Sequence, residues 1–205
     1  MLKLTLVRHA PTAWNEAKRY QGWGDLGLST VGRARARRLA ERLQGRRFDR
    51  VVCSDLRRAR ETAELIVPGQ EVTCDLRLRE MNFGAWEGLT RGECRKRFGE
   101  RYRAWTKDPT THPPPGGETL AGFEERVRRA ADELPSAGTC LAVGHAGTMR
   151  ILLSRALGVP FAATMRLRIS GCALTEVELH PDGGATVLNL NDASHLAGLA
   201  EGLSP

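Results

Sequence analysis

The sequence predicts an α/β fold: a three-layer sandwich with a mostly parallel central sheet, helices on both faces and a small inserted cap. Short apolar segments typical of strands alternate along the chain with amphipathic segments typical of helices. Several strand segments are apolar at consecutive positions, as in strands that are buried on both faces of a parallel sheet. The length of 205 residues suits one domain with a single core.

The first half of the chain contains three predicted strands and two predicted helices. The first strand ends in a polar loop, residues 9–28, that contains three glycines. Ser29 or Thr30 caps the first helix, which runs to about residue 43. Its core-facing stripe is expected at Val31, Ala36, Leu39, Ala40 and Leu43. The strands are expected at residues 3–8, 49–54 and 72–74, and the second helix at residues 56–66.

The middle of the chain predicts a weakly amphipathic helix and then a clearly amphipathic one. The first covers residues 91–108, and a loop rich in Pro and Gly follows over residues 109–117. Thr119 caps the second helix. Its core side comprises Leu120, Phe123, Val127, Ala130 and Leu134. We expect one domain over residues 1–205, with residues 88–118 as the inserted cap.

The last third supplies the most distinct parallel strand, a helix and a hairpin. Residues 139–144 form an apolar run typical of a central strand, and the helix after it ends at Gly158. Two strand-like segments flank a Pro-Asp-Gly-Gly turn, which predicts a β-hairpin. These segments are residues 173–179 and 185–190.

Composition excludes several classes of protein. Hydrophobic residues make up 41% and charged residues 27% of the chain, close to the globular average, which argues against a disordered, collagenous or coiled-coil chain. No apolar run approaches the roughly 18 residues that a membrane span needs. The first residues, interrupted by Lys3, do not resemble a secretory peptide. We expect a soluble, cytoplasmic protein with no membrane partner.

The net charge of +7 and the five cysteines do not by themselves indicate a function. The arginines are interspersed with glutamates, which is typical of solvated helix faces, and no aromatic-interleaved basic strand suggests nucleic-acid binding. The cysteines include no CxxC pair, so neither a metal site nor a dithiol redox site is predicted. No cofactor is expected.

Basic side chains and histidines follow three of the predicted strands. Arg8 and His9 follow the first strand, Arg58 lies just after the second, and His145 follows residues 139–144. A single histidine at such a position is more often a packed residue than a catalyst. However, ligands of parallel α/β sheets bind beyond the carboxyl ends of the strands. Three such ends with the same kind of group predict a site for an anion such as phosphate.

These residues lie in motifs that resemble those of the histidine phosphatase superfamily, which includes cofactor-dependent phosphoglycerate mutase. The amino-terminal motif is LVRHAPTAWN at residues 6–15. The others, in the family's order, are QGWGDLGLS at 21–29, SDLRRARETA at 54–63, LREMNFGAWEG at 78–88, GGET at 116–119, VGHAG at 143–147 and LN at 190–191. The motifs span nearly the whole chain.

The resemblance implies a mechanism and a set of site residues. His9 is the expected nucleophile that becomes a phosphohistidine, and Glu80 is the expected proton donor to the leaving oxygen. Arg8, Arg58 and His145 are expected to bind the phosphoryl oxygens and to complete the catalytic set. Two arginines can stabilise a loose phosphoryl-transfer transition state by position and charge. Further phosphate or substrate contacts are expected from Asn15, Gln21, Gly22 and Ala146.

The sequence departs from the family pattern at four positions. The substituted residues are Ala10, Pro11, Gly27 and Ala146. None removes a reacting group, so the departures bear on the substrate and not on the type of reaction.

A phosphatase is favoured over a mutase because the segment between Glu80 and His145 leaves little room for the larger cap of a mutase. The expected function is a metal-independent phosphomonoesterase acting on a small phosphorylated metabolite, with α-ribazole 5′-phosphate as a candidate. The alternatives are a cofactor-dependent phosphoglycerate mutase and a non-catalytic module that binds phosphorylated ligands or nucleic acid. The sequence leaves the oligomeric state open, with a homodimer as one option.

Side chains of the predicted cap offer further contacts with a substrate. The aromatic rings of Trp86, Tyr102 and Trp105, with His112, are candidates for the entrance, although packing is an equally common role for them. We interpret the arginines between residues 91 and 103 as the solvent-exposed, wet face of a helix. The alternative is that these arginines attract a second anionic group.

Overall fold

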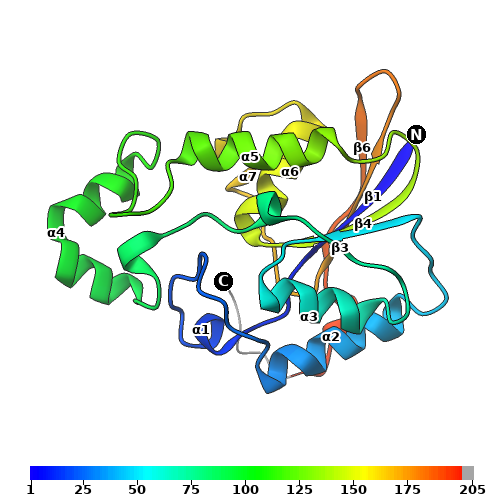
Figure 1. The fold of residues 1–205 in the computed structure, drawn as a ribbon, viewed down its shortest axis with the longest axis horizontal. Coiled ribbons are helices and arrows are strands. Elements are labelled where there is room, and N and C mark those ends of the chain that lie inside the picture. Colours follow the sequence, from blue (N-terminus) through cyan, green and yellow to red (C-terminus); the bar gives the residue numbers. More distant parts are fainter. Residues whose placement is uncertain (200–205) are drawn as a thin grey trace.

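Six strands form one mixed sheet in a computed structural model that describes residues 1–199 (Figure 1). Their order is β3-β2-β4-β1-β5-β6, and β3, β2, β4 and β1 run parallel while β5 and β6 run antiparallel to their neighbours. The sheet is therefore mostly parallel, as predicted. The strands are β1 (Leu2–Arg8), β2 (Arg50–Cys53), β3 (Thr73–Cys74), β4 (Gly138–Gly144), β5 (Leu174–Leu179) and β6 (Ala185–Asp192).

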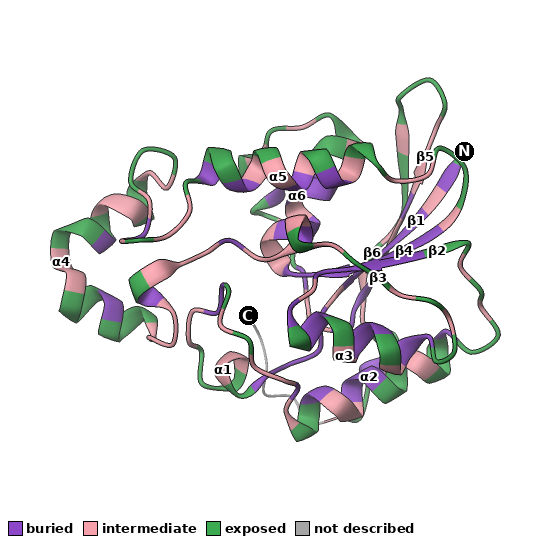
Figure 2. Cartoon of the chain, viewed as in Figure 1, coloured by how far each residue is buried: buried purple, intermediate pink, exposed green. Residues whose placement is uncertain are grey.

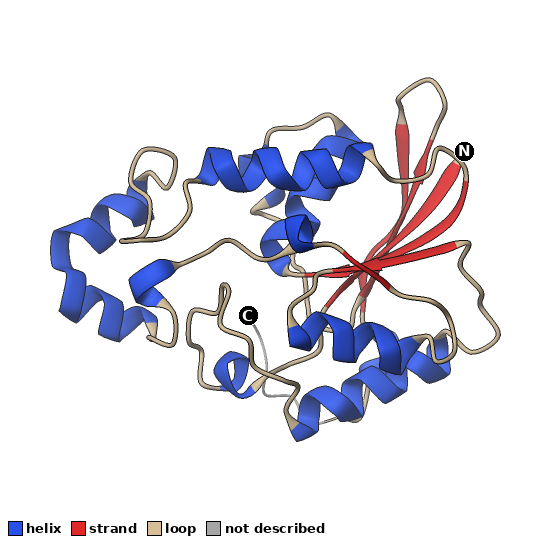
Figure 3. Ribbon diagram, in the orientation of Figure 1, coloured by secondary structure: helices blue, strands red, loops and turns tan. Residues whose placement is uncertain are grey.

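Helices cover both faces of the sheet and give it a three-layer arrangement (Figure 3). One face carries α2 (Thr30–Arg42) and α3 (Arg57–Ile66), and the other carries α5 (Leu120–Asp132) and α6 (Ala146–Leu157). Side chains alternate between the two cores because successive residues of a strand point to opposite faces. In β4, Leu141 packs with α2 and α3, while Ala142 packs with α5 and α6. The strands in the middle of the sheet are mostly buried (Figure 2). The predicted fold class is confirmed.

The first predicted helix begins and ends almost as expected, but its buried stripe differs. Ser29 is the N-cap of α2, and its hydroxyl accepts a hydrogen bond from the Gly32 amide. Val31, which we expected in the core, is 37% exposed, whereas Gly32 and Arg35 are buried. The difference arises because α2 approaches the loop after β1 so closely that a glycine lies at the contact.

The segment after Gly88 forms α4 (Arg91–Lys107), which stands away from the sheet (Figure 1). The expected helix is present but broken, because Gly99 has non-helical backbone angles, φ 48° and ψ −113°. Its buried side chains pack around Trp86, which is fully buried in a short 3-10 helix, Gly84–Trp86. Tyr20 joins the same cluster from the amino-terminal loop, and its hydroxyl lies 2.9 Å from that of Tyr102.

Three predictions about the elements need correction. The expected loop over residues 9–28 contains a short helix, α1 (Ala13–Glu16), stabilised by a capping box between Thr12 and Asn15. A further short helix, α7 (Phe161–Thr164), was not predicted. Leu134 lies beyond the end of α5 and is only partly buried. Among the residues that the structure describes, no helix is long and apolar enough to cross a membrane.

The packing of α2 onto the loop after β1 yields a test of the fold. A Cβ added at Gly32 would lie 2.0 Å from the Pro11 carbonyl oxygen, so the substitution Gly32→Ala forces the backbone apart. We expect it to lower the free energy of unfolding by about 1–3 kcal/mol in urea titrations. In the control Gly92→Ala, the new Cβ would lie 3.9 Å from the Thr90 hydroxyl oxygen, so stability should be unchanged or slightly higher. Equal stability of the two variants would contradict this packing.

Candidate active site

The register between β1 and β4 places the two predicted histidines side by side. Arg8 pairs with Gly144 at the end of this parallel ladder, and the His9 amide donates to the Gly144 carbonyl at 2.8 Å. His9 and His145 therefore leave adjacent strands at the same edge. Their ring centroids are 5.1 Å apart, with 58° between the ring planes.

Arg58 comes to the same point from the first turn of α3 and is fully buried. Its Nη1 donates to the Gly24 carbonyl at 2.9 Å and its Nη2 to the Gly22 carbonyl at 2.7 Å. The Nε and Nη2 atoms also lie 3.3 and 3.1 Å from His145 Nδ1. The guanidinium thus holds the imidazole of His145 from one side.

The hydrogen bonds of the two imidazoles assign different roles to their Nε2 atoms. His9 Nδ1 lies 2.7 Å from the Ala10 carbonyl, an acceptor, so neutral His9 carries its proton on Nδ1 and a lone pair on Nε2. His145 Nδ1 faces the donors of Arg58, so its proton lies on Nε2. That Nε2 is buried and has no hydrogen-bond partner among the described residues. A buried donor of this kind is suited to an oxygen of a ligand.

Both histidines are neutral in the folded protein near pH 7. The pKa of His9 is lowered well below its ordinary value of 6.5 by burial and by the charges of Arg58 and Arg8. Burial and Arg58 likewise lower the pKa of His145 well below 6.5. Burial also lowers the pKa of Arg58, to about 10, so its guanidinium remains charged. The site therefore combines neutral imidazoles with fixed positive charge.

Arg8 is held by the loop that precedes β5. Its Nη1 donates to the Ile169 carbonyl at 2.8 Å, and its own carbonyl accepts from the Cys172 amide at 3.0 Å. This loop is fixed by Asn191, whose Oδ1 accepts from the Ser170 amide at 2.6 Å. Asn191, the second residue of the LN motif, therefore positions Arg8 by fixing this loop.

Glu80 lies over the amino terminus of α6. Its Oε1 accepts from the Met81 amide at 2.9 Å, and its Oε2 accepts from the Gly147 amide at 3.1 Å. A Cβ at Gly147 would lie 2.3 Å from the Glu80 carboxylate, so only glycine admits the carboxylate there. Glu80 also attracts the charges of Arg8 and Arg58.

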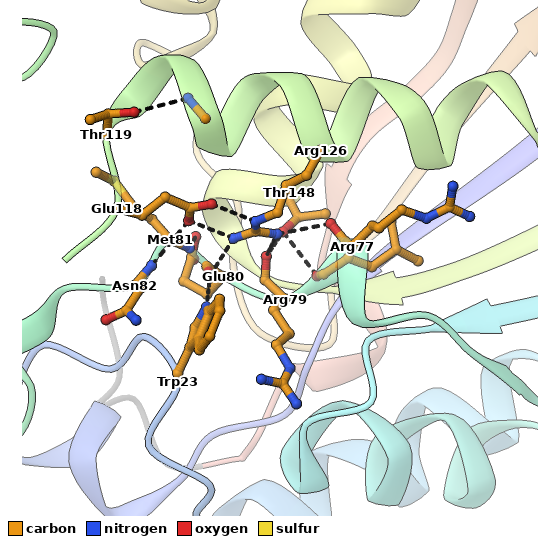
Figure 4. A network of polar contacts seen from close by, with 12 residues as sticks. Trp23, Arg77, Arg79, Glu80, Met81, Asn82, Glu118, Thr119, Arg126 and Thr148 are labelled. Carbon is orange, nitrogen blue, oxygen red and sulfur yellow. Dashed lines mark hydrogen bonds and ion pairs between the residues drawn. The ribbon is translucent and has the colours of Figure 1, made fainter.

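A network around Arg126 fixes the backbone of residues 77–80 (Figure 4). Arg126, on α5, forms a two-pronged ion pair with Glu118, with N–O distances of 2.7 and 2.8 Å. The same guanidinium donates to the carbonyls of Arg77, Arg79 and Glu80 at 2.7 to 2.8 Å. Trp23 Nε1 adds a bond to the Glu80 carbonyl at 3.0 Å. The GGET motif thus supplies Glu118, which orients the arginine that holds the Glu80 segment.

A cavity of about 650 Å³ opens beside His9. Four of the predicted site residues line it, namely Arg8, His9, Asn15 and Ala146. Its other lining residues are Pro11, Ala17, Lys18, Arg19, Tyr20, Arg35, Thr90, Arg91, Gly92, Arg150 and Gly171. The volume is in the range of pockets for small-molecule ligands.

The other five predicted residues do not line this cavity, namely Gln21, Gly22, Arg58, Glu80 and His145. Gln21 and Gly22 are buried; Gln21 accepts from the Thr12 hydroxyl at 2.7 Å, and Gly22 contributes the carbonyl that binds Arg58. Asn15 lines the cavity, but its side-chain oxygen is already bonded to Thr12. Ala146 is the first residue of α6, next to His145.

Several residues of the cavity escaped the sequence analysis. Lys18 lies in the turn after α1, and Arg35 and Arg150 lie on helices. None of the three carried a motif signal, because single basic residues at such positions are normally solvated. Arg91, interpreted as part of a wet face, also lines the cavity. In contrast, Trp86, Tyr102 and Trp105 pack against one another inside the cluster around α4. His112 is exposed on the loop after α4. Over residues 1–199, no group of three His, Cys, Asp or Glu side chains is arranged to hold a metal ion.

Comparison with known proteins shows the family. The family model of the histidine phosphatase superfamily (branch 1) matches residues 4–193. The chain belongs to this superfamily. The resemblance found in the sequence is therefore confirmed.

Relatives of this histidine phosphatase superfamily member include alpha-ribazole phosphatases and a probable phosphoglycerate mutase. It is 34% identical over 195 residues to the adenosylcobalamin/alpha-ribazole phosphatase of Salmonella typhimurium, covering 93% of this chain and 96% of that protein. It is 34% identical over 211 residues to a Yersinia enterocolitica protein named "probable phosphoglycerate mutase GpmB", covering 96% and 95%. The solved alpha-ribazole phosphatase of Shigella flexneri superposes with a TM-score of 0.86 at 29% identity, covering 93% of this chain and 96% of that one.

The depressed pKa values of His9 and His145 predict a loss of stability in acid. In the unfolded chain both imidazoles bind protons as the pH falls through about 6.5, whereas in the folded protein they remain neutral to lower pH. Below about pH 6.5 the unfolded state therefore binds more protons, and each histidine lowers the free energy of unfolding by about 1.4 kcal/mol per pH unit. Urea unfolding between about pH 7.5 and about pH 5.5 measures this slope. The double variant His9→Gln/His145→Gln should show a shallower slope, and an unchanged slope would contradict the assignment.

The network around Arg126 predicts a second effect on stability. Glu118→Ala removes the carboxylate of a pair whose side chains are only 16% and 17% exposed, which should lower the free energy of unfolding by about 1.5–3 kcal/mol. The control is Glu125→Ala on α5, the helix that carries Arg126, because the pair between Glu125 and Arg129 is 60–69% exposed and contributes little. Thermal and urea unfolding of both variants checks the difference; similar effects would refute the role of Glu118.

Proposed function

We propose that the protein is a phosphomonoesterase that hydrolyses a small phosphorylated metabolite through a phosphohistidine at His9. The observation that carries the proposal is the pairing of the two imidazoles beside buried positive charge. His9 presents an Nε2 lone pair, and His145 presents an Nε2–H that has no partner among the described residues. These are a nucleophile and a donor for a phosphoryl oxygen, 5.1 Å apart between ring centroids.

The first half of the reaction follows from these groups. A phosphoryl group enters the cavity beside Arg8, and the buried charge of Arg58 acts on it through His145. The His9 lone pair attacks phosphorus, an N–P bond forms and the bond from phosphorus to the ester oxygen breaks. Glu80, in its protonated form, gives its proton to the leaving oxygen and becomes a carboxylate. Catalysis by position and charge of this kind is typical of phosphoryl transfer.

The second half returns the enzyme to its starting state. Water attacks phosphorus while the Glu80 carboxylate takes one of its protons. The N–P bond breaks, its electron pair returns to His9, and inorganic phosphate leaves through the same cavity. The cavity lies directly beside His9, which supports water as the acceptor.

The names of the relatives suggest two candidate reactions for this chain. The alpha-ribazole phosphatase relatives make α-ribazole 5′-phosphate a candidate substrate here. The relative named as a phosphoglycerate mutase keeps a mutase as the second candidate. Both reactions use the same phosphohistidine and differ in whether water or a second phosphorylated molecule accepts the group.

A panel of phosphomonoesters separates these candidates. It includes α-ribazole 5′-phosphate, and 3-phosphoglycerate with and without 2,3-bisphosphoglycerate. Release of inorganic phosphate without the bisphosphate is the expected result. Isomerisation of 3-phosphoglycerate that requires the bisphosphate would establish the mutase instead. Binding of phosphorylated ligands without turnover would favour a non-catalytic module.

Substitution of the two reacting groups should have unequal effects. His9→Ala removes the atom that accepts phosphorus and should abolish turnover, whereas Glu80→Gln removes only the proton donor. We expect Glu80→Gln to lower kcat by about 10²–10⁴-fold and to leave measurable activity. Steady-state kinetics and trapping of a ³²P-labelled enzyme measure these effects. The controls are His180→Ala, in the turn between β5 and β6, and Glu64→Gln, on the exposed side of α3. Complete loss in both reacting-group variants would contradict the assigned roles.

A further inference from the structure

The wall of the cavity is strongly cationic. Six of its residues are basic, namely Arg8, Lys18, Arg19, Arg35, Arg91 and Arg150, and none of its lining residues is Asp or Glu. Among these six, the described residues provide a carboxylate within ion-pair distance only to Arg19, which pairs with Glu93 at 2.9 Å. The remaining charges face the cavity without a counterion from residues 1–199.

Arg35 is the most unusual member of this wall. It lies on the buried side of α2 and is only 8% exposed, yet no described residue forms a hydrogen bond or an ion pair with its guanidinium. Its Nε is fully buried and unpartnered. Burial raises the pKa of the Cys172 thiol, and the charges of Arg35 and Arg8, which lie near this residue, partly offset that effect. A buried cation without a partner is costly, and such a group is expected to meet an anion.

Arg150 lies on α6, on the same side of the cavity as Ala146. Its Nη2 donates to the Leu167 carbonyl at 3.2 Å, while its Nε is buried and has no partner in the described part of the chain. Burial lowers the pKa of Arg150, and the charge of Glu80 partly offsets this effect. Arg150 also repels Arg8, which places it near the phosphoryl end of the cavity.

Counting charges indicates that a phosphoryl group alone does not require Arg35 and Arg150. A phosphate monoester carries about two negative charges at neutral pH, which Arg8 and Arg58 already match. Arg35 and Arg150 add two further positive charges on the wall of a cavity of about 650 Å³, which has room for more than a phosphoryl group. Planar guanidinium groups suit a carboxylate or a phosphate because they donate two parallel hydrogen bonds.

We propose that the substrate carries a second anionic group, a carboxylate or a second phosphate, and that Arg35 and Arg150 bind it. This proposal rests on the phosphatase function and names the class of substrate for the same site. It disfavours α-ribazole 5′-phosphate as the substrate, because that molecule carries a single phosphate and no carboxylate. Lys18 and Arg91 extend the positive wall on the side of α1 and α4 and attract the doubly anionic molecule as it enters. Arg35 is thereby a specificity-determining residue that the motifs of the sequence do not reveal.

Two matched pairs of substrates test the proposal. Glycerol 3-phosphate and 3-phosphoglycerate differ by a carboxylate, and glucose 6-phosphate and glucose 1,6-bisphosphate differ by a phosphate. For at least one pair, we expect kcat/KM to be about tenfold or more higher for the doubly anionic member. A preference within the first pair identifies the second group as a carboxylate, and a preference within the second pair identifies it as a phosphate. Arg35→Gln should reduce this preference by about tenfold.

The control variant is Arg37→Gln, which removes an exposed arginine from the same helix and should retain the preference. Arg150→Gln gives an independent test if Arg35→Gln does not fold, as judged by circular dichroism. The absence of a preference in the unmodified protein would overturn the proposal. A preference that survives in folded Arg35→Gln and Arg150→Gln would overturn it as well.

A binding experiment separates this proposal from the phosphatase function. Calorimetric titration of the His9→Ala variant with 3-phosphoglycerate and with glycerol 3-phosphate measures recognition without turnover. Tighter binding of 3-phosphoglycerate, with no hydrolysis of any of the four esters by the unmodified protein, would refute the phosphatase and support the second subsite. Hydrolysis of the esters with equal affinity and equal kcat/KM within each pair would support the phosphatase and refute the subsite.

Discussion

The hydrogen-bonded ladder between β1 and β4 sets the distance between His9 and His145, and the rest of the candidate site is arranged around that pair. The ladder is in register up to Arg8 and Gly144, so the next residue of each strand leaves the sheet at the same level. A shift of one residue in either strand would turn one imidazole to the opposite face. The apolar side chains that alternate between the two cores hold this register, which links the packing of the whole sheet to the spacing of two rings.

The arginines of the site can still attract an anion because their hydrogen-bond acceptors in the protein are neutral groups, chiefly carbonyl oxygens. Arg58 donates to the carbonyls of Gly22 and Gly24, and Arg8 donates to that of Ile169. Neutral carbonyl oxygens satisfy buried N–H groups without cancelling their charge. Burial, together with this charge, keeps the imidazole of His9 unprotonated at a pH where a free histidine would begin to bind protons. One arrangement thus favours both the binding of an anion and a neutral imidazole at His9.

The sequence predicted the framework well because strands and their polar ends have local signals. Residues 139–144 form an apolar run that ends in Gly-His, and Arg8-His9 ends another, so their meeting at one sheet edge follows from parallel topology. The break at Gly99 was missed because glycine within a helical pattern is often tolerated. Arg35 was missed because its burial depends on how closely Gly32 approaches Pro11, a contact between segments that no local pattern encodes. The hydrogen bonds from Arg126 to Glu118 and to the Glu80 carbonyl are likewise tertiary contacts, although the GGET motif indicated Glu118.

The aromatic cluster around Trp86 has a mechanical consequence for the cavity. Tyr20 belongs to the segment that follows Asn15 and Lys18, yet its ring packs among Trp86, Tyr102 and Trp105. Backbone hydrogen bonds join Tyr20 to Gly88 and Leu89 as well, at 2.9 Å each. These contacts join the outer wall of the cavity to α4, so we expect the wall and α4 to move together, and any widening of the entrance to bend the chain where the two meet the sheet.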